Sequence, residues 1–160
     1  MRSASFIIPF FALLVIVTTW AGERKRARPS RSLADDLREL TKGKHGWRGR
    51  AITIRRELTG KEEQVIPALA FLPLDKGAKP EDESLVIVGV DDSGLTFGLL
   101  TTFKLVEKKS KRFIIIGEGD KQVALSYSLQ DGKLKLTADK KIRVKGEGEI
   151  DYSGERTRKN

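Results

Sequence analysis

The sequence predicts an all-β fold: an antiparallel barrel or sandwich of about eight or nine short strands, preceded by one short helix. Short runs in which apolar and polar residues alternate follow one another from residue 51 to residue 152, and turn residues separate them. The strongest hairpin signal is Asp131-Gly132 between two such runs, because Gly accepts a positive φ and Asp tolerates it. A chain of 160 residues is long enough for one domain of ordinary size.

The predicted strands cover residues 51–54, 65–72, 85–90, 97–105, 112–116, 123–129, 134–136, 142–144 and 150–152. The run 85–90 is apolar throughout, as in a strand that is covered on both faces. Pro67 has no backbone N–H, so we expect its strand at an edge of the sheet or at a bulge.

One segment has clear helical periodicity. Leu33, Leu37 and Leu40 share one face of a helix from Ser32 to Thr41. Ser32 is a favourable N-cap residue, and the glycine at position 43 can end the helix. A helix of this length is marginal alone, so we expect its leucine face to pack on the sheet or to close one end of a barrel.

The first 21 residues have the pattern of a secretory signal peptide. Arg2 precedes an almost wholly apolar run, Phe6 to Val17, and the small residue Ala21 stands where cleavage is expected. We therefore expect export to the periplasm or the extracellular space. The alternative is a retained membrane anchor formed by residues 6–21, because the basic residues that follow oppose translocation.

The net charge of +9 is concentrated outside the predicted β domain. Residues 22–31 are basic and poor in apolar side chains, which indicates a disordered linker. Residues 156–160 form a basic tail, and the β domain between them, residues 32–155, is nearly neutral. This distribution argues against nucleic acid as a partner, since nucleic-acid-binding domains usually carry their charge on a folded face.

The linker is either a solvated spacer or a region that attaches to an anionic surface. Its cations are Arg24, Lys25, Arg26, Arg28 and Arg31.

The composition excludes several kinds of active site. The chain has no cysteine, which removes disulfides, thiolate metal sites and a cysteine nucleophile, and His45 is its single histidine. We therefore predict no catalytic residues, no metal site and no cofactor. Chemistry carried by carboxylates of distant strands is the one enzymatic alternative left open.

Four groups of residues resemble small lipocalin-like (calycin-type) domains. In chain order they are Asp36-Leu37-Arg38-Glu39-Leu40, Gly46-Trp47, the hairpin Tyr127-Ser128-Leu129 with Leu134-Lys135-Leu136, and Tyr152-Ser153-Gly154-Glu155-Arg156. The resemblance implies a barrel in which the tryptophan of the first strand packs near an arginine of the last strand and closes one end. Trp47 with Arg156 or Arg158 would fill these roles.

Two functions follow as expectations, both of them non-enzymatic. The first is a binding module that holds a small apolar ligand in the barrel mouth or between sheets, lined by Phe97, Phe103, Phe113 and Tyr127. The second is an envelope-associated interaction protein that its basic linker and tail attach to an anionic membrane surface.

Overall fold

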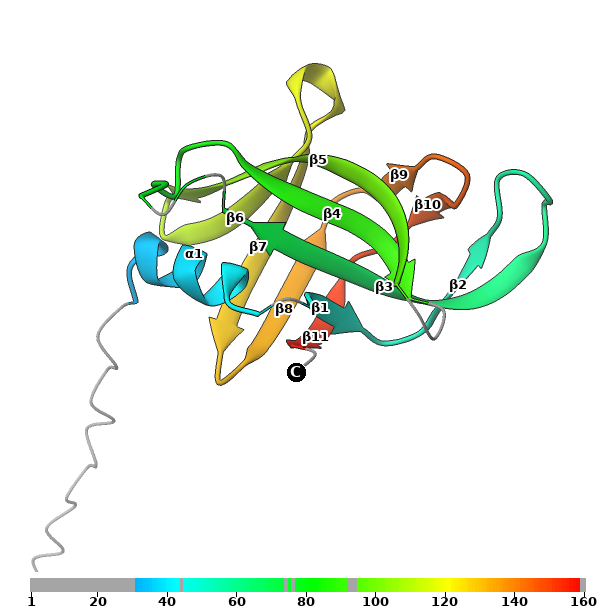
Figure 1. Ribbon diagram of the computed structural model, residues 1–160, viewed down its shortest axis with the longest axis horizontal. Helices are drawn as coiled ribbons and strands as arrows, with labels where there is room; N and C mark the ends of the chain where they lie inside the picture. Colours follow the sequence, from blue (N-terminus) through cyan, green and yellow to red (C-terminus); the bar gives the residue numbers. More distant parts are fainter. Residues whose placement is uncertain (1–30, 44, 74, 76, 92–94, 159–160) are drawn as a thin grey trace, which may run out of the picture. The chain divides into compact units, whose positions relative to one another are not determined.

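The computed structural model describes residues 31–43, 45–73, 75, 77–91 and 95–158, with the backbone alone for residues 95–97 (Figure 1). Its elements in chain order are α1 (Leu33–Thr41), β1 (Trp47–Gly49), β2 (Ile52–Arg55), β3 (Glu62–Leu72), β4 (Ser84–Asp91), β5 (Leu95–Lys108), β6 (Lys111–Ile116), the 3₁₀ turn η1 (Gly119–Lys121), β7 (Val123–Gln130), β8 (Lys133–Ala138), β9 (Ile142–Val144), β10 (Gly148–Ile150) and β11 (Gly154–Arg158). The all-β class and the short N-terminal helix are confirmed. The expected signal peptide, and the linker up to residue 30, lie outside the described residues.

The sheet closes on itself into an eight-stranded antiparallel barrel. Strands β3 to β8 pair in chain order, β8 pairs with β11, β11 pairs with β1, and β1 returns to β3. All of these pairings are antiparallel. The sequence left a barrel and a sandwich open, and the β1–β3 pairing decides for the barrel because it joins the two edges of the sheet. A closed barrel of this kind is compatible with the lipocalin-like resemblance.

Strand β3 changes partner along one of its sides, and Pro67 lies where the change occurs. Residues 62–65 pair with β2, Ala68 and Leu69 pair with β1, and Pro67 pairs only with β4 on the opposite side. The N and C=O of a strand residue point to the same side, and the Pro67 carbonyl accepts a hydrogen bond from Arg156 in this gap. The missing N–H of Pro67 therefore costs no ladder hydrogen bond. Strand β3 lies inside the sheet, so our expectation that Pro67 places it at an edge or a bulge was wrong.

An extra residue in β5 interrupts the alternation that was predicted for residues 97–105. The register of β4 and β5 shifts between Val88 and Gly89, and Gly98 is left without a partner in β4. A side chain at position 98 would overlap Val144 of β9 and the carbonyl oxygen of Val88. Gly98 therefore allows the β9–β10 hairpin to pack closely against the barrel wall.

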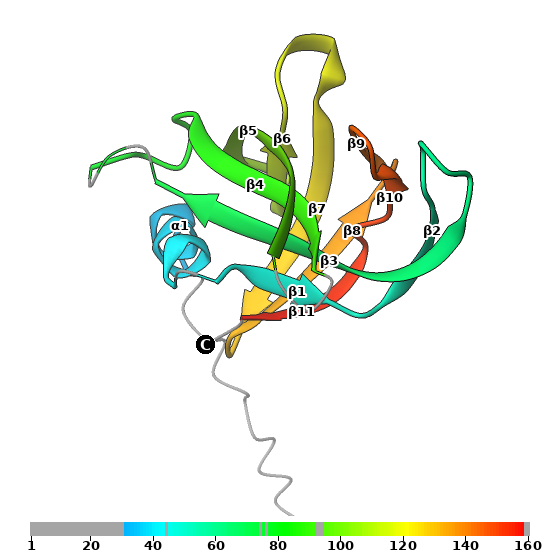
Figure 2. The same ribbon diagram turned by 45° about the vertical axis from the view of Figure 1, so that its right-hand side comes forward.

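Different elements cover the two ends of the barrel (Figure 2). Helix α1 lies at one end against β3 and β5, where Leu37 and Leu40 join the core, as the leucine face predicted. The β9–β10 hairpin lies beside β2 at the other end, and Ile142, Val144 and Ile150 extend the core there. One continuous apolar cluster thus runs from the helix to the hairpin.

The last strand contains residues that we assigned to a basic tail. β11 extends to Arg158, and Arg156 within it is only 1% exposed. Successive residues of a strand point to opposite faces, so Arg156 and Arg158 lie on the same face of β11. The β domain therefore continues to Arg158 instead of ending at residue 155.

We expect Gly49→Ala to lower the free energy of unfolding by about 1–3 kcal/mol, the usual cost of overpacking. A Cβ at position 49 would overlap Nη1 of Arg156, whose guanidinium is buried and held by two main-chain carbonyls. Urea unfolding measures the loss. The control is Gly77→Ala, since nothing lies within 4 Å of a Cβ there, and equal losses in the two variants would contradict the argument.

Candidate functional site

The four aromatic residues predicted to line a ligand site do not form one lining. Phe103 is 1% exposed and packs edge-on against Phe71, with ring centroids 4.8 Å apart. Tyr127 is buried at the end that α1 covers, where it hydrogen-bonds to the helix. Phe113 is half-buried on the outer face of β6, opposite the buried Ile114, and of Phe97 only the backbone is described.

The middle of the barrel is a packed core. Inward side chains from five strands of the barrel, β3, β4, β6, β7 and β8, have no accessible surface: Leu69, Val88, Ile114, Leu125 and Leu134. A side chain without accessible surface touches no space that would admit a water molecule. At these positions the barrel holds its own side chains, as small eight-stranded barrels often do.

Trp47 and Arg158 lie together at the end that α1 covers. The guanidinium carbon of Arg158 is 4.9 Å from the centre of the Trp47 ring, a cation–π contact. The indole Nε1 of Trp47 donates to the carbonyl oxygen of Leu40 at 3.0 Å, and Arg158 donates to the carbonyl oxygen of Glu39 at 2.9 Å and to its carboxylate. Of the two arginines that the resemblance offered, Arg158 has this position, and it ties β11 and β1 to the helix.

Arg156 is buried in the barrel and has no acidic partner among the described residues. Its Nη1 donates to the carbonyl oxygen of Pro67 at 3.2 Å, and its Nη2 donates to that of Tyr152 at 2.6 Å. The guanidinium carbon lies 4.9 Å from the centre of the Tyr152 ring. Burial lowers the pKa of Arg156 to about 10, so the side chain remains charged at neutral pH.

Helix α1 begins at a capping box and thereby places its acidic residues. The Ser32 hydroxyl accepts from the backbone N–H of Asp35 at 3.1 Å, and the Asp35 carboxylate accepts from the backbone N–H of Ser32 at 3.3 Å. The hydrogen bonds from the side chain and backbone of Ser32 hold the pKa of Asp35 below its usual value. The next residue of the helix, Asp36, then faces the barrel.

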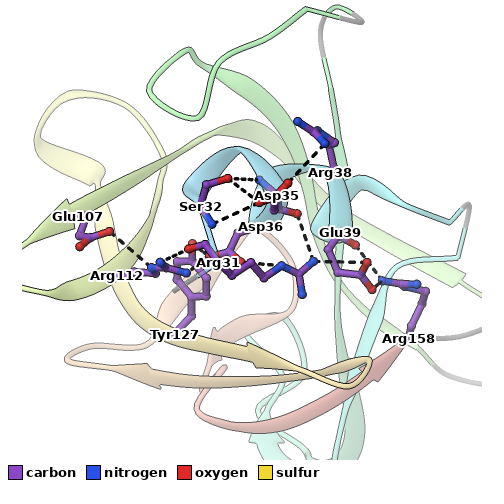
Figure 3. A network of polar contacts seen from close by, with 10 residues as sticks. All are labelled: Arg31, Ser32, Asp35, Asp36, Arg38, Glu39, Glu107, Arg112, Tyr127 and Arg158. Carbon is purple, nitrogen blue, oxygen red and sulfur yellow. Dashed lines mark hydrogen bonds and ion pairs between the residues drawn. The ribbon is translucent and has the colours of Figure 1, made fainter. Parts of the chain in front are cut away.

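Asp36 is the centre of a polar network that fastens α1 to the barrel (Figure 3). It is 1% exposed, and its Oδ2 accepts from the Tyr127 hydroxyl at 2.9 Å and from Nη1 of Arg112 at 2.8 Å. Its Oδ1 lies 3.2 Å from Nε of Arg31. Burial, together with the neighbouring Asp36 charge, raises the pKa of Tyr127, so this phenol stays protonated and donates.

Glu39, about one turn after Asp36 in the helix, completes the network. It lies between Arg158 and Arg31, whose Nη2 is 3.5 Å from Oε2. Burial acts to raise the pKa of Glu39, but the hydrogen bond from Arg158 and the nearby cations outweigh it, and the pKa lies below its ordinary value. Arg31, which we grouped with the linker cations, thus forms ion pairs within the domain. The other linker cations, Arg24, Lys25, Arg26 and Arg28, lie outside the described residues.

A surface groove lies at the opposite end, between β2 and the β9–β10 hairpin. Its volume is about 420 Å³, and it opens to solvent. The residues that line it are Thr53, Ile54, Arg55, Arg56, Glu57, Gly60, Lys141, Arg143, Gly148 and Glu149. Four of these side chains are basic and two are acidic, so the groove has an excess of positive charge.

The side chains of two of the four groove cations, Lys141 and Arg143, make neither an ion pair nor a hydrogen bond among the described residues, whereas Nε of Arg55 donates to Gly60 O. Arg56 is bound to Glu63 and Glu147. Lys141 and Arg143 are exposed and have no ion-pair partner in the part of the chain that the structure describes. Lys141 precedes β9, and Arg143 lies within it on the face opposite the buried Ile142 and Val144. Both side chains line the groove, so the ammonium and the guanidinium can contact the same anion.

The described residues hold no group of three or more His, Cys, Asp or Glu side chains that could bind a metal ion. His45 is exposed. Within the same residues, no helix combines the length and apolar character that a membrane span needs. No protein family, curated protein or solved structure matches the chain.

Sequence reasoning missed both the network and the groove. Asp36 is separated from Arg112 by 76 residues and from Tyr127 by 91, and periodicity gives no signal at such distances. An acidic residue next to the apolar stripe of a helix was the one local sign that Asp36 is buried. The groove arises from the packing of two hairpins, each of which has an ordinary mixed charge pattern in the sequence.

We expect Asp36→Ala to lower the free energy of unfolding by about 3 kcal/mol, at the lower end of the range for breaking a buried ion pair, because Arg31 and Arg112 keep partial contact with solvent. The variant leaves the Tyr127 hydroxyl without its acceptor. Urea unfolding checks this, with Asp120→Ala in the exposed η1 turn as the control. An Asp36 variant as stable as the control would show that the network does not hold the helix.

The pH dependence of the free energy of unfolding tests whether the ionised Glu39 carboxylate stabilises the fold. Folding lowers the pKa of this carboxyl below its ordinary value of 4.5, so its contribution is present above about pH 4.5 and is lost as the pH falls through the lowered value. The stability difference between wild type and Glu39→Gln is therefore expected to narrow on acidification. Urea midpoints at a series of pH values measure it, and a difference that does not change with pH would exclude the argument.

Proposed function

We propose that the chain is an exported, non-enzymatic binding module of the lipocalin-like barrel type, and that it recognises an anionic ligand in the groove between β2 and the β9–β10 hairpin. The observation that carries the proposal is the pair Lys141 and Arg143, which are exposed and lack ionic partners among the described residues. By contrast, Arg112 and Arg158 at the α1 end are paired with acids.

The groove has the character of a recognition site for an anion. Its volume lies within the range of small-molecule sites, about 300–1,000 Å³. The arginine supplies a planar fork of donors and the lysine supplies a compact charge, and both bind carboxylate or phosphate oxygens. The groove acid Glu57 accepts a hydrogen bond from the backbone N–H of Gly146 at 3.3 Å, so its charge is partly satisfied by the domain itself.

A small apolar ligand is the other candidate, and the closed barrel favours it. At the end that α1 covers, Leu37, Tyr127 and Leu129 retain 6%, 8% and 8% of their accessible surface, whereas the middle of the barrel has none. Such a ligand would have to bind at that end. Its binding would not depend on Lys141 or Arg143, which lie at the other end.

We expect the double variant Lys141→Glu/Arg143→Glu to bind inorganic tripolyphosphate about a hundredfold more weakly than wild type, since each lost charged hydrogen bond contributes about 1.5 kcal/mol. Titration calorimetry measures the affinity. The control, Lys121→Glu/Lys135→Glu, changes the net charge equally but lies on η1 and on the outer face of β8. An equal loss in the control would show general charge attraction, and no binding to wild type would refute the proposal.

A further inference from the structure

We infer that the anionic ligand is the surface of an anionic lipid bilayer, and that Leu58 enters its interfacial region beside the groove. This inference rests on the proposed function, because lipid headgroups would occupy the same groove. It adds the source of the anion and a second, apolar contact.

Leu58 is the most exposed of the large apolar side chains described, with 84% of its surface accessible. The turn that presents it is ordered by backbone hydrogen bonds: Gly60 N–H donates to Arg56 O at 2.9 Å, and Arg56 N–H donates to Lys61 O at 2.8 Å. Nε of Arg55 also donates to Gly60 O at 3.2 Å. The protein thus holds a leucine in solvent on a structured turn, where an uncovered apolar side chain is unfavourable.

The neighbouring turn braces this position. Glu57 accepts from the backbone N–H of Gly146, and Arg56 pairs with Glu147, so the β2–β3 turn and the β9–β10 turn are joined. Both views show the two turns side by side at the end of the barrel away from α1 (Figures 1 and 2). We call residues 55–61 and 140–149 the groove end. Leu58 follows the groove residue Glu57 and precedes Gly60 by two positions, so it belongs to the rim of the groove.

The charges of the groove end favour an anionic surface. Its exposed cations are Arg55, Lys61, Lys140, Lys141, Arg143 and Lys145. Within it, Glu57 and Glu147 are bound by the backbone of Gly146 and by Arg56, and Glu149 is the remaining exposed acid. On adjoining segments, Glu63 is bound to Arg56, and Glu62 and Asp139 also oppose the cations. Basic side chains next to a membrane are attracted by the negative potential of its lipids.

Leu58 distinguishes a bilayer from a soluble anion. A leucine gains free energy by leaving water for the boundary between headgroups and acyl chains, and interfacial binding combines such burial with attraction between basic residues and anionic lipids. A phosphate or a polyphosphate in solution gives Leu58 no apolar environment. The combination of an exposed leucine with free cations therefore selects the lipid surface.

The absence of cysteine from the chain allows a site-specific test in the full-length protein. Leu58→Cys is labelled with an environment-sensitive fluorophore and mixed with vesicles of phosphatidylcholine and phosphatidylglycerol, or of phosphatidylcholine alone. We expect a blue shift with the anionic vesicles only, and quenching by brominated lipids. Adding Lys141→Glu/Arg143→Glu is expected to abolish the shift because it removes the electrostatic attraction, whereas added salt is expected to reduce the shift only in part. The emission wavelength of the label reports the surroundings of position 58 alone, so membrane binding by other parts of the chain does not produce the blue shift.

Leu100→Cys, labelled in the same way, is the matched control. Leu100 is 60% exposed on β5, outside the groove end. Equal responses at positions 58 and 100, or no response at 58 while tripolyphosphate still binds, would overturn the bilayer inference and leave the proposed function standing. Failure of both vesicle insertion and tripolyphosphate binding would refute the two together.

Discussion

A barrel closes only if the two edges of its sheet meet, and here the buried Arg156 of β11 lies beside β1 and β3, the strands whose pairing joins those edges. Its Cα pairs with Gly49 of β1, whose missing side chain leaves room for the guanidinium. The partner change in β3 leaves the carbonyl oxygen of Pro67 without a ladder partner on that side, and Nη1 of Arg156 fills the vacancy. Burying a charge is costly, but two carbonyl hydrogen bonds and the ring of Tyr152 offset the loss of water. The Arg156 guanidinium thus supplies the hydrogen bond that a backbone N–H of a neighbouring strand would otherwise donate to Pro67 O.

The two ends of the barrel are covered by different elements that make different kinds of interaction. At the α1 end, the carboxylates of Asp36 and Glu39 contact polar side chains of the domain, so their negative charges are neutralised within the protein. These partners are Tyr127, Arg31, Arg112 and Arg158. At the β9–β10 end, apolar residues such as Val144 and Ile150 extend the core, and the ion pair between Arg56 and Glu147 joins the two turns. Lys141 and Arg143, exposed groove cations without ionic partners among the described residues, belong to the second end.

Local pattern predicted most of the strands and the helix because each depends on residues close in the chain. The Asp131-Gly132 turn has the positive φ values, 49° and 73°, that its sequence requires. Closure of the barrel was not predictable in this way. The β1–β3 pairing begins just after Pro67, and whether this proline costs a hydrogen bond depends on where the partners β1 and β2 lie along β3. Arg156 and Arg158 were assigned to a tail because cations near a terminus are usually solvated. Their burial follows from carbonyl and carboxylate partners far away in the sequence, such as Pro67 and Glu39.

The high net charge of the chain is a poor guide to how it would bind an anion. Several cations of the domain, Arg31, Arg56, Arg112 and Arg158, are paired with acids, and Arg156 is buried. The proposed recognition by the groove depends on a few positioned side chains, and screening by salt weakens such short-range contacts less than it weakens attraction by extended basic segments. Salt dependence therefore separates the two ways in which this protein could hold an anionic surface. Steep dependence indicates the basic linker, and shallow dependence indicates Lys141 and Arg143 in the groove.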